Sequence, residues 1–253
     1  MKRIFFIFVV VAVVFSLAAC SEEAVLDQAK VYEIKSDIKA IEVRISAADF
    51  VIKQGNAFSV ESNLKYLTVS EKNGILTILE EIKVGVSYTN PALTLYVPEG
   101  IVFENVNITT GAGKVTTDTL SAKSLKLQLG AGDVRIDSLY VTSNADIDGG
   151  TGKVTITEGA INDLDLTMGV GELNLTAAIL GDSDLILGVG KSNLTLIGSK
   201  EDYSIDIEKG IGSIKVDGVD VSEFDSEGNG PNNIEIEGGV GAINLNFREG
   251  MIK

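Results

Sequence analysis

Apolar and polar residues alternate with a period of two along most of the chain after residue 31. Three clear examples are Ile41-Val43-Ile45, Leu76-Ile78 and Leu93-Leu95-Val97. This alternation indicates β-strands with one buried face, and no stretch after residue 31 has a convincing helical period. Asn73-Gly74 predicts a tight hairpin, because a type I′ turn needs positive φ at both central positions. We therefore expect a β segment over residues 31–100, where Pro98 and Gly100 end a strand.

The rest of the chain, residues 101–253, is an internal repeat built on Gly-x-Gly. Its first glycine stands at positions 111, 130, 150, 169, 188, 210 and 239, with successive spacings of 19, 20, 19, 19, 22 and 29 residues. Three aliphatic columns accompany it. Three residues before the first glycine stand Ile108, Leu127, Ile147, Leu166, Leu185, Ile207 and Ile236. After the second glycine come Val115, Val134, Val154, Leu173, Ser192, Ile214 and Ile243, and two residues later Thr117, Ile136, Ile156, Leu175, Leu194, Val216 and Leu245.

Such a repeat predicts a stack of coils, because one repeat is too small to bury its apolar face alone. The alternation runs on both sides of the glycine pair, so the pair should be a corner that needs the conformational freedom of glycine. The fold class is therefore all-β, a β-helix-like solenoid of about 19–20 residues per coil. A flat β-sandwich and a meander of hairpins are the alternatives. The insertion over residues 217–233 should form a loop protruding at one edge.

The residue after each glycine pair forms a fourth column, whose charges alternate along the first five repeats. Its members are Lys114, Asp133, Lys153, Glu172, Lys191, Ser213 and Ala242. Coils stacked in sequence order would place opposite charges side by side on one solvated face.

The N-terminus predicts export and lipid anchoring. Lys2 and Arg3 precede an apolar run of twelve residues, and Leu17-Ala18-Ala19-Cys20 resembles a bacterial lipobox. We expect residues 1–19 to be a lipoprotein signal peptide, Cys20 to carry fatty-acyl chains such as palmitate, and residues 20–30 to form the lipidated end and a polar tether. A plain secretory signal and an N-terminal membrane anchor are the alternatives. After cleavage the chain would keep 19 basic and 36 acidic residues, a formal charge of −17.

Composition removes several kinds of chemistry. The chain has no His, no Trp and one Cys, and its formal charge is −15. It can build neither a histidine-dependent triad nor a cysteine-cluster zinc site, and its charge disfavours nucleic-acid binding. No phosphate-binding glycine motif opens a helix. We expect no catalytic residue, no cofactor and no metal site.

Smaller motifs have structural interpretations. Gly130–Asp133 and Asp148–Gly152 match calcium-binding nonapeptide repeats only in part, because the acidic position alternates in sign. The pairs Asp146 and Asp148, and Asp163 and Asp165, could suit glycoside chemistry, but a solvated surface is the expected interpretation in so acidic a chain. The triplets at Asn107, Asn174 and Asn193 match a glycosylation pattern that has no meaning by itself here.

Residues 31–250 resemble the bacterial putative-adhesin family, a β-strand-repeat domain of unknown function. The resemblance rests on Ile38–Val43, on Leu93–Pro98 and on the Gly-x-Gly-x-Val/Leu repeats. It implies a right-handed β-solenoid in an extracytoplasmic place, and it brings no catalytic residues.

The expected function is that of a non-enzymatic cell-surface lipoprotein, an adhesin-like scaffold that presents a binding face to an unknown protein or glycan ligand. The membrane would be contacted through the lipid on Cys20, and no nucleic acid is expected. Two alternatives stay open. One is an envelope-stress sensor or regulator that binds a membrane protein, and the other is a polysaccharide-acting enzyme.

Overall fold

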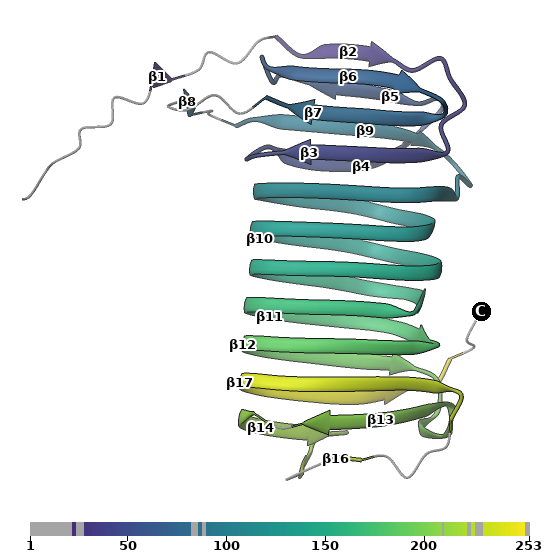
Figure 1. Cartoon of the computed structure of the whole chain (residues 1–253), viewed down its shortest axis with the longest axis vertical. Coiled ribbons are helices and arrows are strands. Elements are labelled where there is room, and N and C mark those ends of the chain that lie inside the picture. The colour runs from purple at the N-terminus through teal and green to yellow at the C-terminus, as the bar shows by residue number, and fades with distance from the viewer. Residues whose placement is uncertain are drawn as a thin grey trace, which may run out of the picture.

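The computed structural model of the chain describes residues 22–23, 28–81, 86–87, 90–208, 210–221, 224–225 and 230–250. These residues form a tall stack of coils made almost entirely of strands (Figure 1). The signal peptide and Cys20, both predicted from the sequence, lie outside the described residues.

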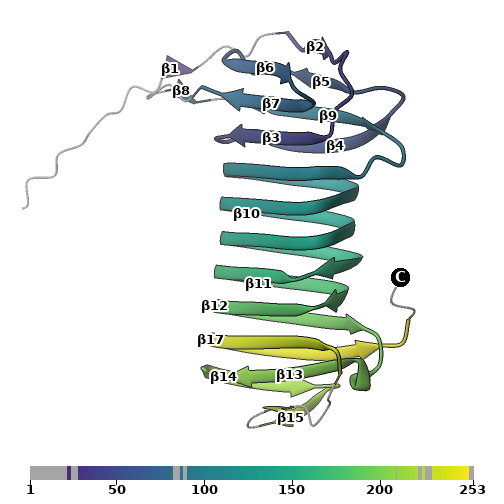
Figure 2. The same ribbon diagram turned by 45° about the vertical axis from the view of Figure 1, so that its right-hand side comes forward.

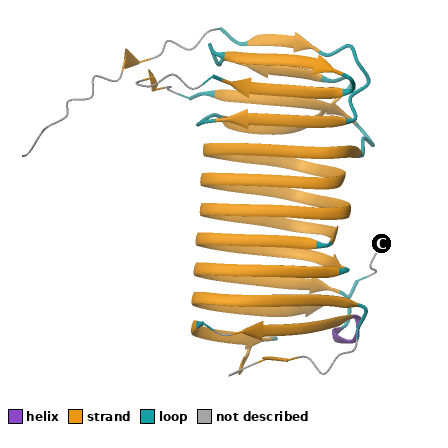
Figure 3. Cartoon of the chain, viewed as in Figure 1, coloured by secondary structure: helices purple, strands orange, loops and turns teal. Residues whose placement is uncertain are grey.

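The body of the stack is a β-solenoid. It contains β10 (Phe103–Asn162), β11 (Leu164–Leu180) and β12 (Asp182–Ile197), which wind as nearly continuous coils (Figure 3). Neighbouring coils pair in parallel, with Ile147 opposite Leu166 and Leu166 opposite Leu185. One repeat is therefore one coil. The solenoid predicted from the sequence is confirmed over the sandwich and the meander.

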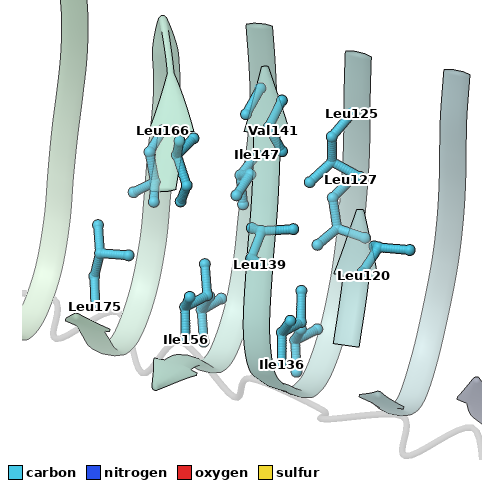
Figure 4. Packing of buried hydrophobic residues seen from close by; sticks show 14 of the residues in the cluster. Leu120, Leu125, Leu127, Ile136, Leu139, Val141, Ile147, Ile156, Leu166 and Leu175 are labelled. Carbon is cyan, nitrogen blue, oxygen red and sulfur yellow. The ribbon is translucent and has the colours of Figure 1, made fainter. Parts of the chain in front are cut away.

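The three aliphatic columns form the core. Every member is buried, including the two polar exceptions Thr117 and Ser192. In Figure 4, Leu127, Ile147 and Leu166 follow one another on successive coils, and Ile136, Ile156 and Leu175 form a second row. Thr117 tolerates burial because its hydroxyl donates a hydrogen bond to the carbonyl of Thr119 at 3.2 Å.

The last coils are not stacked in sequence order. The chain leaves β12, turns through η1 (Lys200–Asp202), and forms β13 (Tyr203–Glu208) and β14 (Ile211–Val216) one position further out. It then returns as β17 (Asn232–Arg248), which pairs with β12 on one side and with β13 and β14 on the other. The sequence-order stacking assumed above is wrong here. The 22-residue spacing between positions 188 and 210 supplies the extra length for the step.

The first coil is enclosed in the same way. It consists of β3 (Ala40–Ile45) and β4 (Asp49–Gly55). β10 lies on one side of it, and β7 (Ile75–Glu80) and β9 (Ala92–Pro98), which come later in the chain, lie on the other. Thus β3 and β4 near one end of the stack, like β17 near the other, lie between two neighbouring coils.

Short antiparallel strands cover both ends of the stack. At the N-terminal end these are β2 (Lys30–Glu33), β5 (Ser59–Ser62) and β6 (Leu67–Lys72), and at the C-terminal end β15 (Val219–Val221) and β16 (Phe224–Asp225). A two-residue parallel pair, β1 (Glu22–Glu23) with β8 (Val86–Ser87), stands apart. Such strands shield edges that would otherwise pair with another chain.

Two turn predictions have different outcomes. β6 and β7 form the predicted hairpin, with positive φ at Asn73 (55°) and Gly74 (77°). The prediction of a protruding loop over residues 217–233 is wrong where the segment is described. β15 instead pairs with β14 below the last coil (Figure 2), and β16 pairs with β13. The insertion closes the stack because the outermost coil has an open edge to cover.

A buried ring fixes the step from β12 to β13. The Tyr203 hydroxyl donates to the carbonyl of Ile197 at 2.6 Å, and burial raises the pKa of Tyr203 to about 12 from its ordinary value of 10. Nearby, Lys200 pairs with Asp217 at 2.7 Å, and the hydrogen bond from Lys200 lowers the pKa of the Asp217 carboxyl.

The raised pKa of Tyr203 predicts a loss of stability in alkali. Below pH 10 the phenol is neutral in both states, so its contribution is fully present. Between pH 10 and about 12 the unfolded phenol ionises while the folded one does not, which should lower the free energy of unfolding by roughly 2–3 kcal/mol. Urea titrations across this range should show Tyr203→Phe losing less stability than the wild type, since both proteins share the lysine titrations. Equal losses would contradict the buried, neutral phenol.

Candidate functional site

The glycine corner brings the backbones of successive coils into direct contact. A Cβ placed on Gly190 (φ 149°) would lie 1.7 Å from the carbonyl oxygen of Gly171, and one on Gly241 (φ 150°) would lie 1.7 Å from that of Gly190. No side chain fits in this space. The corner lies at the edge of the stack where β13 ends and β14 begins (Figure 1). On the last four coils the residue between the two glycines is exposed there.

These middle residues form an exposed apolar stripe on the last four coils, which we call the corner ridge. It consists of Val170, Val189, Val240 and Ile211, in the order of the stack. Their exposed fractions are 50%, 50%, 47% and 76%. Higher in the stack the same position holds Ala112, Ala131 and Thr151, so the ridge is confined to the C-terminal coils. Aligned exposed aliphatics of this kind are typical of interaction surfaces.

On five adjacent coils, the residue four positions before the first corner glycine is a carboxylate. We call this set the acidic column. In stack order its members are Asp146, Asp165, Asp184, Glu235 and Asp206. Lys126 pairs with Asp146, whereas the other four carboxylates make no ion pair among the described residues. Strands in a sheet lie about 4.8 Å apart, and like charges at that distance repel. This arrangement reduces stability, as functional surfaces often do.

The column contains carboxylates that the sequence had suggested as possible acid–base pairs. Asp146 and Asp165 lie in it on neighbouring coils, while Asp148 lies on the next outward position. Asp163 instead stabilises a turn, since its carboxylate accepts the Asp182 N–H at 3.1 Å. Among the described residues no group of three or more acidic, His or Cys side chains could hold a metal ion.

The other side of the corner is electrically balanced. The alternating column predicted from the sequence is confirmed at Lys153, Glu172 and Lys191, which pair in register on adjacent coils. Lys153 and Glu172 lie 3.3 Å apart. A hydrogen bond from Asn174 and then the Lys153 ammonium lower the pKa of Glu172. Because of the step in coil order, Ala242 rather than Ser213 follows Lys191.

Reversing one charge in this column should destabilise the stack. Asp133→Lys would place three lysines on successive coils, and each exposed pair lost contributes about 0.2–1 kcal/mol. We expect a fall of about 1 kcal/mol at low salt that shrinks at high salt. Asp133→Asn, which removes the attraction to Lys114 and Lys153 without adding repulsion, should lose about half as much. Identical thermal melts of Asp133→Lys and wild type at low salt would show that these side chains are not neighbours.

An amide ladder runs beside this balanced column. Asn193 donates to Asn174 at 2.7 Å and Asn244 donates to Asn193 at 2.9 Å, while Asn174 donates to Glu172 at 3.0 Å. The sequence offered Asn174 and Asn193 only as glycosylation triplets. Asn174 and Asn193 occupy the same position in their repeats, and this is the sequence signal for the ladder. Asn244 joins it because β17 pairs with β12.

Two hollows lie on the opposite edge of the stack from the corner. One, of about 390 Å³, is lined by residues that include Val97, Val102 and Asp118, and the other, of about 480 Å³, by residues that include Tyr140, Glu158 and Arg248. Each mixes apolar and polar groups. Neither is lined by the acidic column.

Several solved structures are similar to this chain. A solved structure of a "putative adhesin" from Bacteroides fragilis is 14% identical, covers 86% of this chain and 96% of its own, and superposes with a TM-score of 0.55. Others are a "putative adhesin" from Parabacteroides merdae (14% identity, 87% and 95% coverage, TM-score 0.41) and a "putative lipid binding protein" from Parabacteroides distasonis (16%, 88% and 99%, 0.39).

At this identity the first structure shows a shared fold. No curated protein matches the sequence. The family model described as Toastrack DUF4097 matches residues 35–246, which is most of the chain and nearly all of its repeats. The chain therefore belongs to the Toastrack DUF4097 family.

Proposed function

We propose that this chain is a non-enzymatic scaffold, held by lipid at the outer face of a bacterial membrane, that binds a macromolecule along its glycine corner. The observation that carries the binding role is the unpaired corner ridge beside the acidic column. Both features lower stability in water, and a partner that covers them would remove the cost. The solved adhesin-like fold is consistent with a surface role.

The solenoid suits such a role physically. Parallel coils with interlocked ends form a stiff rod, and a repeat array offers an extended lateral surface. Among the described residues no helix is long and apolar enough to cross a membrane. The proposed attachment is through lipid at Cys20. Each buried CH₂ contributes about 0.8 kcal/mol, so two or three acyl chains hold durably where one does not.

Metabolic labelling tests the anchor. Cys20→Ser removes the acceptor sulfur, so labelled palmitate should enter the wild type and not the variant. Equal labelling of both proteins would rule out a lipid at Cys20. Protection of the wild type from protease in outer-membrane-permeabilised cells, with digestion once the cells are lysed, would exclude an extracytoplasmic place.

A further inference from the structure

We propose that the corner ridge and the acidic column together bind a cationic amphipathic helix. This inference rests on the proposed binding role and names the chemistry of the partner. The ridge would receive the apolar stripe of the helix, and the carboxylates beside it would receive its lysines and arginines.

The spacing of the ridge fits a helix. Its four members stand on adjacent coils about 4.8 Å apart, so the ridge is about 14 Å long. An α-helix repeats its apolar face about every 5.4 Å, and roughly ten residues span this length. A β-strand repeats one face about every 6.6 Å and would lose register with the ridge after two coils. Ile186, 47% exposed, widens the apolar surface beside Val189.

The charge on the two sides of the ridge determines the sign of the partner. On the side before the corner, the two outward-facing rows nearest the ridge carry six exposed carboxylates on the same four coils. These are Asp165, Asp184, Glu235, Asp206, Glu237 and Glu208. On the side after the corner stand Glu172, Lys191, Ala242 and Ser213. Lys191 is the one base among these flanking residues, and Lys209 lies outside the described residues. A cation is therefore the complementary partner.

The same charges disfavour the other occupants of an apolar ridge. A second copy related by a two-fold axis that crosses the ridge would bring one acidic column against another. With an axis along the ridge, each acidic column would face the other flank, which offers Lys191 as its one base. An anionic bilayer would also meet like charge. A cationic segment gains both from apolar contact and from relief of the repulsion within the column.

Surface plasmon resonance with the full chain, immobilised through a C-terminal tag, tests the proposal independently of the lipid anchor. The probe is an 18-residue helical peptide with Leu at i, i+3, i+4 and i+7 spacing and Lys elsewhere. Its references are a peptide of the same charge with the Leu replaced by Ser, and one with the Lys replaced by Glu. We expect saturable binding of the first peptide, at least tenfold weaker binding of the second, and none of the third.

Variants assign the binding to this face. Val189→Ser with Val240→Ser should raise the Kd at least tenfold, and Asp184→Asn with Glu235→Gln should raise it severalfold and flatten its salt dependence. Val102→Ser and Glu104→Gln, which change an exposed valine and an exposed carboxylate elsewhere, are the matched controls. All six substitutions are at exposed positions, and circular dichroism checks the fold.

Three results would overturn the inference. They are equal binding of the Lys/Ser peptide, loss of affinity in the controls as large as in the ridge variants, and ridge-dependent self-association or binding to phosphatidylglycerol vesicles in place of the peptide. If the peptide fails while the ridge still contacts a protein on intact cells, the inference about the helix is wrong and the binding role stands.

Discussion

Gly190→Ala should unfold much of the stack. The added Cβ would lie 1.7 Å from the carbonyl oxygen of Gly171, and the neighbouring atom is backbone that cannot rotate away. The φ of 149° is also one that L-residues rarely adopt. Separating two coils at the corner would break ladder hydrogen bonds on both sides. We expect a loss of at least about 3 kcal/mol in the free energy of unfolding, a large share of a typical domain's stability.

Gly218→Ala is the matched control. Gly218 also has positive φ (79°), but a Cβ there would meet no atom within 4 Å. Its replacement should cost only about 1 kcal/mol of local strain. Urea unfolding followed by circular dichroism compares the two variants. Similar midpoints would mean that the coils do not touch at the corner.

Leu245→Asp should be as damaging as Gly190→Ala, although it lies only eight residues before Lys253. Chain ends usually tolerate change, yet β17 is enclosed between two coils and Leu245 is fully buried. An unpaired carboxylate there would have neither solvent nor a partner. We expect a loss of several kcal/mol, and at neutral pH little folded protein.

Asn246→Asp adds the same charge one residue later, on the outward side of β17, and should cost less than about 1 kcal/mol. Expression yield and thermal melting distinguish the two variants. A mild effect of Leu245→Asp would place β17 at the outer end of the stack, in sequence order, and would contradict the enclosed position.

Much of this fold can be predicted from the sequence because a repeat exposes its own register. Ile147, Leu166 and Leu185 align by counting, and the glycine pair locates the corner without coordinates. The order of the last coils cannot be obtained in this way. The repeats that contain Ile207 and Ile236 could each form the coil next to Leu185. The spacings between repeats limit only the distance that the connecting segment can span. Which one pairs with Leu185 depends on how the insertion covers the open end.

The candidate site was partly visible in the sequence. The middle residues of Gly-x-Gly change from Ala and Thr to Val and Ile along the chain, and this change is the sequence signal for the corner ridge. The sequence pairs Asp146 with Asp148 and Asp163 with Asp165 within one strand, whereas Asp146 and Asp165 are neighbours on adjacent coils. The contrast between a balanced column and a uniformly acidic one therefore appears only once the coils are stacked.

Photo-cross-linking on intact cells tests the binding role most directly. A photoreactive amino acid at Val189 lies on the corner ridge, and one at Lys123 is an exposed control on a coil far from it. The account predicts a discrete protein adduct from position 189 that Ile211→Ser weakens, and no such adduct from position 123. Equal adducts from the two positions, or none from position 189 while position 123 is cross-linked, would contradict a partner at the glycine corner.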